Sequence, residues 1–126
     1  MGKYQILTEA GPKPIGPYSQ GIRVGDLVFV SGQGPLDPAT GKLAGETIEE
    51  QTRRVLENIK AILDAGGATM GDVVKSTVHL SDLSLFSRFN SIYATYFPDP
   101  KPTRTTVGSQ LLGIMVEIDV VAYIGK

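Results

Sequence analysis

The segment from Met115 to Ile124 restricts the possible folds more than any other part of the sequence, because its alternating residues form two unlike sets. One set is entirely apolar: Val116, Ile118, Val120, Ala122 and Ile124. The other set is mixed: Met115, Glu117, Asp119, Val121 and Tyr123. Alternate side chains of a strand point to opposite faces of a sheet. The segment therefore predicts a strand with one face on helices and the other in contact with polar groups.

Two other segments show helical periodicity. Thr47 and Glu50 have the spacing of a capping box, and the apolar residues that follow recur with a helical period until Gly66 and Gly67 end the run. A second helix is predicted from about Ser84 to Phe97, and its aromatic face comprises Phe86, Phe89, Tyr93, Tyr96 and Phe97. Prolines at 98, 100 and 102 end this helix.

The remaining regular segments are typical of strands. Tyr4–Leu7 predicts a short edge strand, and Gly21–Val24 with Leu27–Ser31 predicts a hairpin. Val73–Leu80 is rich in β-branched residues and alternates as a strand should. A chain of 126 residues closes one core but is short for two. The order of elements predicts one α+β domain over residues 1–126, a mixed sheet with both helices on one side.

A sheet with helices on only one side leaves its other face uncovered. Here that face would carry Met115, Val121 and Tyr123 beside charged groups. Half-apolar surfaces of this kind are commonly buried by identical subunits. We therefore expect a closed homo-oligomer with pockets where the subunits meet.

The composition excludes several classes of chemistry. The chain has no cysteine, which removes disulfides, thiolate metal sites and a cysteine nucleophile. The chain has a single histidine, His79, in the middle of a predicted strand. This argues against a histidine-based zinc site and against a Ser-His-Asp triad. The remaining chemistry falls to carboxylates, arginine, tyrosine, hydroxyls and backbone groups, with no metal or organic cofactor expected.

Charge and hydropathy exclude other partners. The net charge of −1 and the lack of a Lys/Arg cluster argue against a nucleic-acid or membrane surface as the main partner. No segment reaches the ~18 apolar residues of a membrane span, and the N-terminus lacks the features of a targeting peptide. We expect a cytoplasmic protein.

Arg104 and Glu117 are the candidate active-site residues. The guanidinium of Arg104 matches a carboxylate in a bidentate way, which suits an anionic small substrate. A surface arginine or a structural ion pair is the other interpretation of Arg104. Glu117 lies among β-branched neighbours, where a carboxylate positioned in a cleft orients a water or shuttles a proton. An exposed strand face is the alternative for Glu117, and Asp119 supports it.

Five further residues are candidates of lower specificity. Ser31 and Gly32 end a strand where backbone amides approach a ligand closely, or where the chain merely turns. Tyr18 offers an aromatic wall with a hydroxyl, although most tyrosines cover core edges. Asn90 lies beside the aromatic helix face and either donates into a cleft or is a local structural residue. His79 is a candidate base, but its position within a strand favours a structural role.

A wider pattern now becomes visible along the chain. Its parts are 16–20 (GPYSQ), 31–33 (SGQ), Gln51 with Asn58, 72–75 (DVVK), Asn90 with Tyr93, 102–107 (PTRTTV) and 116–118 (VEI). In this order and spacing the sequence closely resembles the RidA/YjgF family of reactive-intermediate deaminases. No single motif is diagnostic, but together they cover almost the whole chain.

The resemblance implies a chorismate-mutase-like α+β fold that assembles as a homotrimer with three pockets at the subunit interfaces. It implies hydrolysis of 2-imino and 2-enamino acids, such as 2-aminoacrylate, to 2-oxo acids and ammonia. Arg104 matches the arginine that holds the substrate carboxylate, and Glu117 matches the glutamate that positions water. The substrate-binding positions that it implies are Tyr18, Ser31, Gly32, Asn90 and Thr106.

The sequence departs from the family pattern in two places. Thr106 stands where some members have cysteine, which the water mechanism does not require. The loop between Arg104 and Glu117 is shorter than in some relatives, which bears on pocket size and substrate range.

Two other functions are alternatives to the deaminase. The first is a noncatalytic trimer that binds small carboxylates as a regulator or acts as a chaperone, and retention of Glu117 beside Arg104 favours the enzyme over it. The second is a ribonuclease, which the sequence pI of about 5.8 and the absence of a basic patch weigh against.

Overall fold

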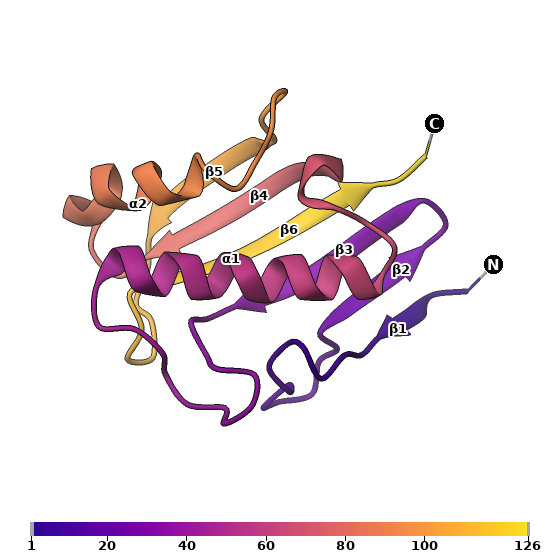
Figure 1. Ribbon diagram of the computed structural model, residues 1–126, viewed down its shortest axis with the longest axis horizontal. Helices are drawn as coiled ribbons and strands as arrows, with labels where there is room; N and C mark the ends of the chain where they lie inside the picture. The colour runs from indigo at the N-terminus through magenta and orange to yellow at the C-terminus, as the bar shows by residue number, and fades with distance from the viewer. Residues whose placement is uncertain (1, 126) are drawn as a thin grey trace.

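The computed structural model describes residues 2–125 and contains one six-stranded sheet (Figure 1). Across the sheet the strands follow the order β1-β2-β3-β6-β4-β5. Their bounds are β1 Tyr4–Ile6, β2 Gly21–Val24, β3 Leu27–Gln33, β4 Val73–Leu80, β5 Thr103–Gly108 and β6 Val116–Tyr123. The C-terminal strand β6 is thus inserted between β3 and β4, in the interior of the sheet.

The sheet is mixed, as the sequence predicts. β4 and β5 are parallel, whereas every other strand pair is antiparallel. A parallel pair needs a crossover connection, and α2 (Phe86–Tyr93) supplies it between β4 and β5. This crossover places α2 directly beside β5.

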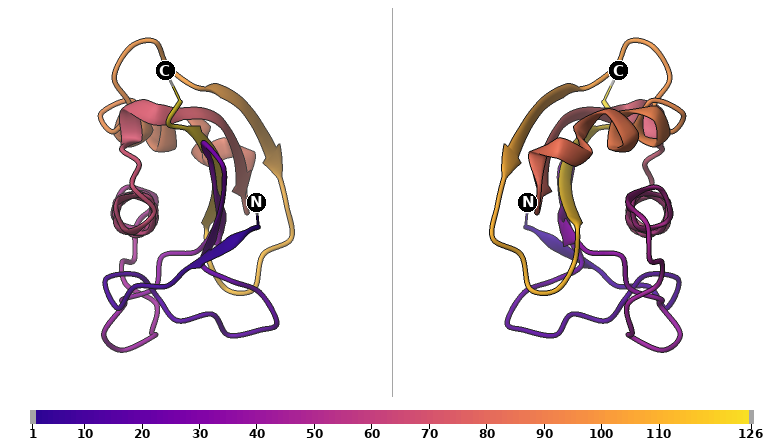
Figure 2. Two further views of the ribbon diagram at one scale, coloured as in Figure 1. Left: turned by 90° about the vertical axis from the view of Figure 1, so that its right-hand side faces the viewer. Right: turned by 90° about the vertical axis from the view of Figure 1, so that its left-hand side faces the viewer.

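Both α-helices lie on the same side of the sheet (Figure 2). α1 runs over Ile48–Ala65 and begins with the predicted capping box: the Glu50 amide donates to Thr47 Oγ1 at 3.2 Å, and the Thr47 amide donates to Glu50 Oε1 at 3.1 Å. Two short 3₁₀ helices, η1 (Met70–Asp72) and η2 (Leu83–Leu85), complete the helical segments. None of the helices among residues 2–125 is long and apolar enough to cross a membrane.

The second helix is shorter than predicted. Its α-helical part covers residues 86–93 rather than 84–97. At its start the Ser84 amide donates to Asp82 Oδ1 at 2.9 Å, which stabilises a 3₁₀ turn instead of an α-helical one. At its end the Tyr96 amide donates to the Tyr93 carbonyl, three residues back, before the prolines follow. Competing side-chain and i→i+3 bonds therefore shorten the helix at both ends.

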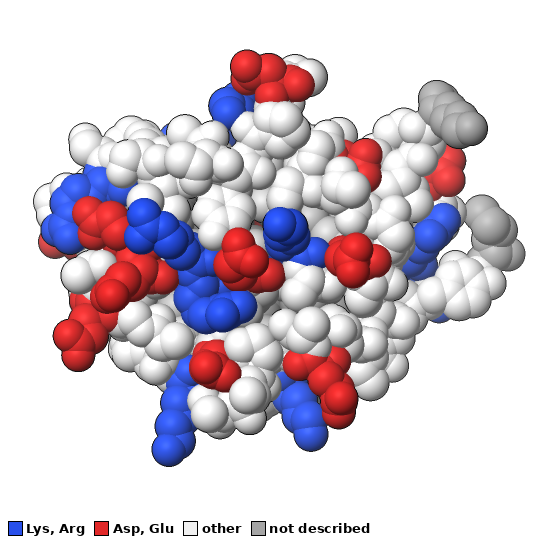
Figure 3. Space-filling view, viewed as in Figure 1, with Lys and Arg blue, Asp and Glu red and all other residues white. Residues whose placement is uncertain are grey.

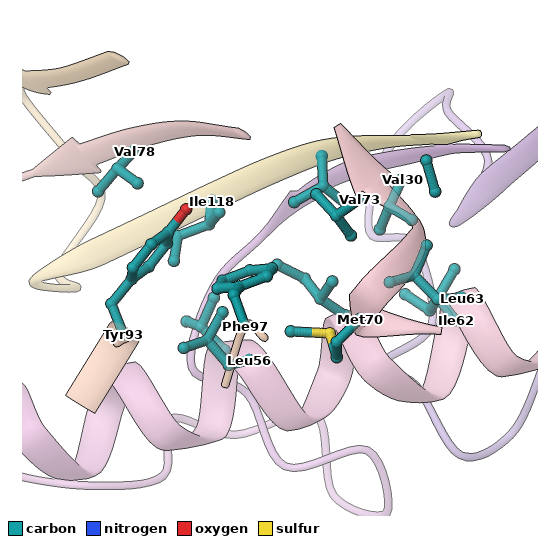
Figure 4. Close-up of a cluster of buried hydrophobic side chains, with 14 of the residues drawn as sticks. Val30, Leu56, Ile62, Leu63, Met70, Val73, Val78, Tyr93, Phe97 and Ile118 are labelled. Carbon is teal, nitrogen blue, oxygen red and sulfur yellow. The ribbon is translucent and has the colours of Figure 1, made fainter. Parts of the chain in front are cut away.

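The hydrophobic core lies between the helices and the sheet. Figure 4 shows side chains of α1, among them Leu56, Ile62 and Leu63, facing strand residues such as Val30 and Ile118. Phe97, which follows α2, is 2% exposed and extends the core beyond the helix itself. Burial of these apolar side chains supplies most of the driving force for this arrangement.

The two predicted faces of β6 are confirmed. Val116, Ile118, Val120 and Ala122 are at most 1% exposed and lie on the helix side. On the other side Glu117, Asp119 and Val121 are half-buried, and Tyr123 is 46% exposed. We call this second side the open face; the neighbouring Phe29 of β3, 41% exposed, belongs to it.

Candidate functional site

Arg104 lies on the helix side of β5. Its strand partner is Ser76 of β4, which is completely buried beneath the helices, and paired residues share a face. The guanidinium carbon lies 4.8 Å from the ring centroid of Tyr93 and 5.4 and 5.7 Å from those of Phe86 and Phe89. The aromatic residues of α2 therefore surround the cation, and their ring faces attract it.

One hydrogen bond holds the guanidinium, and a second holds one of the rings beside it. Arg104 Nη1 donates to Asn90 Oδ1 at 2.8 Å, and the hydroxyls of Tyr93 and Ser76 are 2.6 Å apart. Burial raises the pKa of the Tyr93 hydroxyl, although the bond to Ser76 opposes the shift. Arg104 forms no ion pair within residues 2–125, so no carboxylate of the same chain neutralises its charge.

Thr106 lies two residues further along β5 and therefore on the same side as Arg104. Its hydroxyl oxygen is buried and has no hydrogen-bond partner in the described part of the chain. A cavity of about 280 Å³ adjoins this region and is lined by Asn90, Tyr93, Ala94, Lys101, Pro102 and Arg104. Thr106 is not among the lining residues. We call Arg104, Asn90 and Thr106 the arginine half-site.

Glu117 occupies the open face of β6, against a distorted part of β3. The pairing of β3 with β6 shifts register between Val30 and Gln33, which places Gly32 at a bulge. A Cβ atom on Gly32 would lie 2.7 Å from Glu117 Oε2 and 3.1 Å from its Cδ, closer than atoms pack. Gly32 thus provides space for the carboxylate, which is a more specific role than the ligand approach or turn predicted from sequence.

Ser31 connects this bulge to the loop that carries Tyr18. Its hydroxyl donates to the Ser19 carbonyl at 2.6 Å, and its amide donates to the Gln20 carbonyl at 2.9 Å. The buried Gln20 side chain donates in turn to the Pro12 carbonyl at 2.9 Å and thereby holds the proline-rich loop. The Ser31 hydroxyl is therefore engaged in positioning the loop.

Tyr18, Gly32 and Glu117 line one cavity of about 370 Å³. The loop of residues 109–115, which joins β5 to β6, supplies another wall through Gln110, Leu111, Leu112 and Ile114. Leu112 is 99% exposed and Tyr18 is 46% exposed, so the cavity has an open apolar rim. We call Tyr18, Ser31, Gly32 and Glu117 the glutamate half-site.

The two half-sites lie on opposite faces of the sheet. Glu117 pairs with His79, whereas Arg104 pairs with Ser76, and residues 76 and 79 of β4 have opposite parity. The seven residues predicted from sequence are therefore brought together in two groups, not one. Within a single chain, Arg104 and Glu117 do not face a common cavity.

Two features of the site were not assigned to it by the sequence. The first is the contact between the aromatic face of the second helix and Arg104, which depends on the crossover that sets α2 beside β5. The second feature is the bond between His79 Nδ1 and Ser109 Oγ, 2.7 Å long, at the beginning of the 109–115 loop. Thirty residues separate these partners, so no local pattern indicates the contact.

The helix side of the molecule carries charges of both signs. Figure 3 shows Lys and Arg interspersed with Asp and Glu over this face, without a continuous basic area. One ion pair joins Arg88 Nη2 to Glu49 Oε1 at 2.8 Å and connects α2 to α1. This surface lacks the electrostatic footprint of a nucleic-acid-binding face.

Comparison with known proteins gives consistent matches. The protein family described as Endoribonuclease L-PSP matches residues 8–124. A RutC family protein of Pyrococcus abyssi is 50% identical over 98% of both chains. The chloroplastic Reactive Intermediate Deaminase A of Arabidopsis thaliana is 46% identical over 95% of this chain and 65% of its own length.

Solved structures agree with this assignment. RidA of an Antarctic Psychrobacter superposes with a TM-score of 0.92 at 40% identity, covering 96% of this chain and 99% of the other. Escherichia coli TdcF with bound serine gives a TM-score of 0.89 at 37% identity, covering 95% and 98%. On this evidence of sequence and fold, the chain belongs to the RidA/YjgF/L-PSP family, which includes the RutC proteins.

Proposed function

We propose that this protein is an enamine/imine deaminase that hydrolyses 2-imino and 2-enamino acids to 2-oxo acids and ammonia. The observation that carries the proposal is the Arg104 guanidinium, held by Asn90 and three rings yet without an anionic partner in residues 2–125. Such a preorganised cation suits a small carboxylate. The deaminase name of the Arabidopsis relative and the serine bound to TdcF support a substrate of amino-acid size.

In this proposal Arg104 binds the substrate carboxylate and Thr106 adds a hydrogen bond. Asn90 keeps the guanidinium in one orientation, and Tyr18, Ser31 and Gly32 shape the opposite wall. 2-Aminoacrylate first gains a proton at its methylene carbon and loses one from its nitrogen, which gives the tautomer 2-iminopropanoate. The reaction then starts from the imine form, with its C=N carbon held near the carboxylate anchor.

Glu117 then acts on a water molecule. The water oxygen forms a bond to C2, and its proton passes through Glu117 to the nitrogen. The tetrahedral intermediate now carries a hydroxyl and an amino group on C2. The hydroxyl proton is transferred to the nitrogen as the C=O bond forms and the C–N bond breaks, and ammonia leaves. The sum is one imine and one water to one 2-oxo acid and one ammonia, without metal or redox chemistry.

The complete pocket in this proposal lies between subunits of a homotrimer. The arginine half-site of one chain meets the glutamate half-site of its neighbour, since the two lie on opposite faces of one sheet. Exposed apolar groups on the open face, such as Phe29 and Tyr123, support burial by another copy. The same assembly also suits the alternative function, a noncatalytic carboxylate-binding regulator, for which only the arginine half-site is needed.

Release of 2-aminoacrylate by a pyridoxal-phosphate dehydratase tests the activity directly. We expect the wild-type protein to accelerate loss of the imine and to release pyruvate and ammonia in equal amounts. Trapping of the remaining imine with semicarbazide measures the loss. An imine lifetime unchanged by the protein, together with carboxylate binding measured by calorimetry, would establish the regulator instead.

The role of Arg104 is tested in the same assay. Arg104→Ala removes the carboxylate anchor, and we expect kcat/KM to fall by about 100-fold or more, mostly through KM. Arg53→Ala, an exposed arginine on α1, is the matched control and should retain wild-type kinetics. Full activity of Arg104→Ala would contradict the anchor role while leaving the reaction itself in place.

A further inference from the structure

His79 anchors one end of the loop that lines the glutamate half-site. Its Nδ1 lies 2.7 Å from Ser109 Oγ, and the Ser109 amide donates to the Leu80 carbonyl at 2.9 Å. At the other end of the loop, the Ser81 amide donates to the Met115 carbonyl at 2.9 Å. The end of β4 therefore holds both ends of the loop of residues 109–115.

The same histidine stands directly opposite Glu117. The two are Cα partners in the antiparallel pair of β4 and β6, both are half-buried, and both occupy the open face. Side chains opposed in this way have Cβ atoms about 4.5–5.5 Å apart. β4 lies between β5 and β6 in the sheet, so His79 separates the root of the 109–115 loop from the carboxylate.

Few other charged groups face this ring. Asp119 is the diagonal neighbour on β6, and Lys75 lies four residues back on the same face of β4. On β5 the paired residue is the apolar Val107, and α1 and α2 pack on the opposite side of the sheet. Glu117 is therefore the carboxylate in the position directly across from His79.

The roles of the two ring nitrogens depend on the tautomer of the neutral ring. When the Ser109 hydroxyl donates to Nδ1, the imidazole proton lies on Nε2, where it is available to the carboxylate side. The opposite tautomer would turn a lone pair toward an anion, which is unfavourable. Among residues 2–125 the hydrogen bond of the His79 ring is the one to Ser109, and Glu117 Oε1 and Oε2 have no direct bond to the ring. A water is able to bridge two polar groups that do not bond directly.

We propose that His79 is a positioning residue of the deaminase site, which donates from Nε2 through a water to the Glu117 carboxylate. The expected effect of His79 on kcat rests on the proposed function. The tautomer of His79 and its connection to Glu117 do not depend on that function. Through Ser109 the same ring links the orientation of the carboxylate to the position of the pocket loop. This role extends the site to a residue for which the sequence favoured a structural role.

The tautomer is measured by ¹⁵N NMR. His79 is the only histidine of the chain, so imidazole nitrogen signals need not be assigned among several residues. Above the pH range in which histidines titrate, we expect the Nε2–H form to predominate. Ser109→Ala and Glu117→Gln should each reduce its share, whereas Asp119→Asn should leave it unchanged. A predominant Nδ1–H form, or no response to Glu117→Gln, would overturn the proposal.

Two substitutions separate the functions of the two ring nitrogens. The amide of His79→Gln reaches the position of Nε2, whereas that of His79→Asn reaches only the position of Nδ1. We expect His79→Gln to retain kcat within about threefold and His79→Asn to lose about tenfold in kcat, with KM changed less than twofold. If His79 only anchored the loop through Nδ1, His79→Asn would retain kcat and His79→Gln would lose it, to the same extent as Ser109→Ala. That result would overturn the proposal.

Failure of the proposed function gives a different pattern. A wild-type protein without deaminase activity would remove the kinetic comparison, whereas the tautomer and its response to Glu117→Gln would still decide whether His79 is connected to Glu117. The two ideas are therefore distinguished by separate measurements.

Discussion

At the scale of single residues, the candidate site depends on contacts that leave functional groups available. Arg104 is surrounded by rings and one amide, and Glu117 lies over a glycine. Both charges are held in place without being neutralised by an ion pair in residues 2–125. Preorganised charges of this kind contribute more to a reaction than charges that must first reorient.

Glu117→Gln separates proton transfer from water binding. The amide keeps a hydrogen-bond acceptor in place but cannot take a proton, so we expect kcat to fall about 100-fold or more with KM nearly unchanged. Single-turnover loss of the imine measures this effect. Asp119→Asn, two residues on and on the same face, is the control and should retain kcat within about twofold. Wild-type kcat in Glu117→Gln would leave the carboxylate with an orienting role alone.

Gly32→Ala tests the contact between the bulge and the carboxylate. The added Cβ meets the mobile end of the Glu117 side chain, 2.7 Å from Oε2, so the carboxylate should move while the backbone stays. We expect kcat to fall about tenfold or more, because small displacements of reacting groups are costly. Circular dichroism and thermal melting should show a nearly unchanged fold. Gly71→Ala, whose Cβ would lie 3.4 Å from Pro98, is the control.

At the scale of elements, the crossover from β4 to β5 organises the arginine half-site. It delivers α2 to the side of β5 on which Arg104 lies, so Asn90 and Tyr93 contact the guanidinium. α2 is in turn connected to α1 by the pair of Arg88 and Glu49. The position of α2 on the molecule thus bears on the site as well as on the core.

The pair of Arg88 and Glu49 predicts a pH dependence of stability. The hydrogen bond from Arg88 lowers the pKa of the Glu49 carboxyl from 4.5 to about 2, with help from the backbone at the start of α1. Because the folded state favours the ionised form, the contribution is complete above pH 4.5 and is lost as the pH falls toward 2.

Urea unfolding at a series of pH values measures this contribution. The difference in unfolding free energy between wild type and Arg88→Ala should shrink steadily across the acidic range. Glu49→Gln should show the same loss, and the double variant should add nothing further. Parallel curves for wild type and Arg88→Ala would contradict the assignment of the pKa shift to this contact.

At the scale of the whole molecule, the open face is the main feature that the single chain leaves unexplained. Its apolar groups include Leu27, Phe29 and Tyr123, exposed by 37%, 41% and 46%. The glutamate half-site lies on the same face, whereas the arginine half-site lies on the other. The proposed trimer accounts for both facts, because it covers the apolar groups and joins the half-sites.

Light scattering after size exclusion tests this assembly. We expect a mass about three times the 13.5 kDa of one chain. Phe29→Glu should lower the mass toward one chain and reduce deaminase activity at least tenfold in parallel, because a buried unpaired charge is costly. Leu43→Glu, another exposed apolar residue but outside the sheet, is the control. A fully active monomer would contradict the interfacial pocket.

The sequence by itself determined much of the local structure and the family. The capping box of α1, the bounds of β4 and the two faces of β6 follow from spacing and alternation, which neighbouring residues fix between them. The ends of α2 were predicted wrongly, because Asp82 and the turn bonds after Tyr93 compete with the helical pattern.

Only the tertiary structure decided on which side of the sheet each half-site lies. β5 reads Thr-Arg-Thr-Thr-Val-Gly and has no apolar alternation, so no pattern shows which face Arg104 occupies. That choice comes from the pairing of Arg104 with the buried Ser76, and the register of β4 with β6 then places Glu117 and His79 on the opposite face. Strand pairing joins residues that are far apart in the chain. Its register is set by burial of the whole sheet against the helices, and a local stretch of sequence does not carry that information.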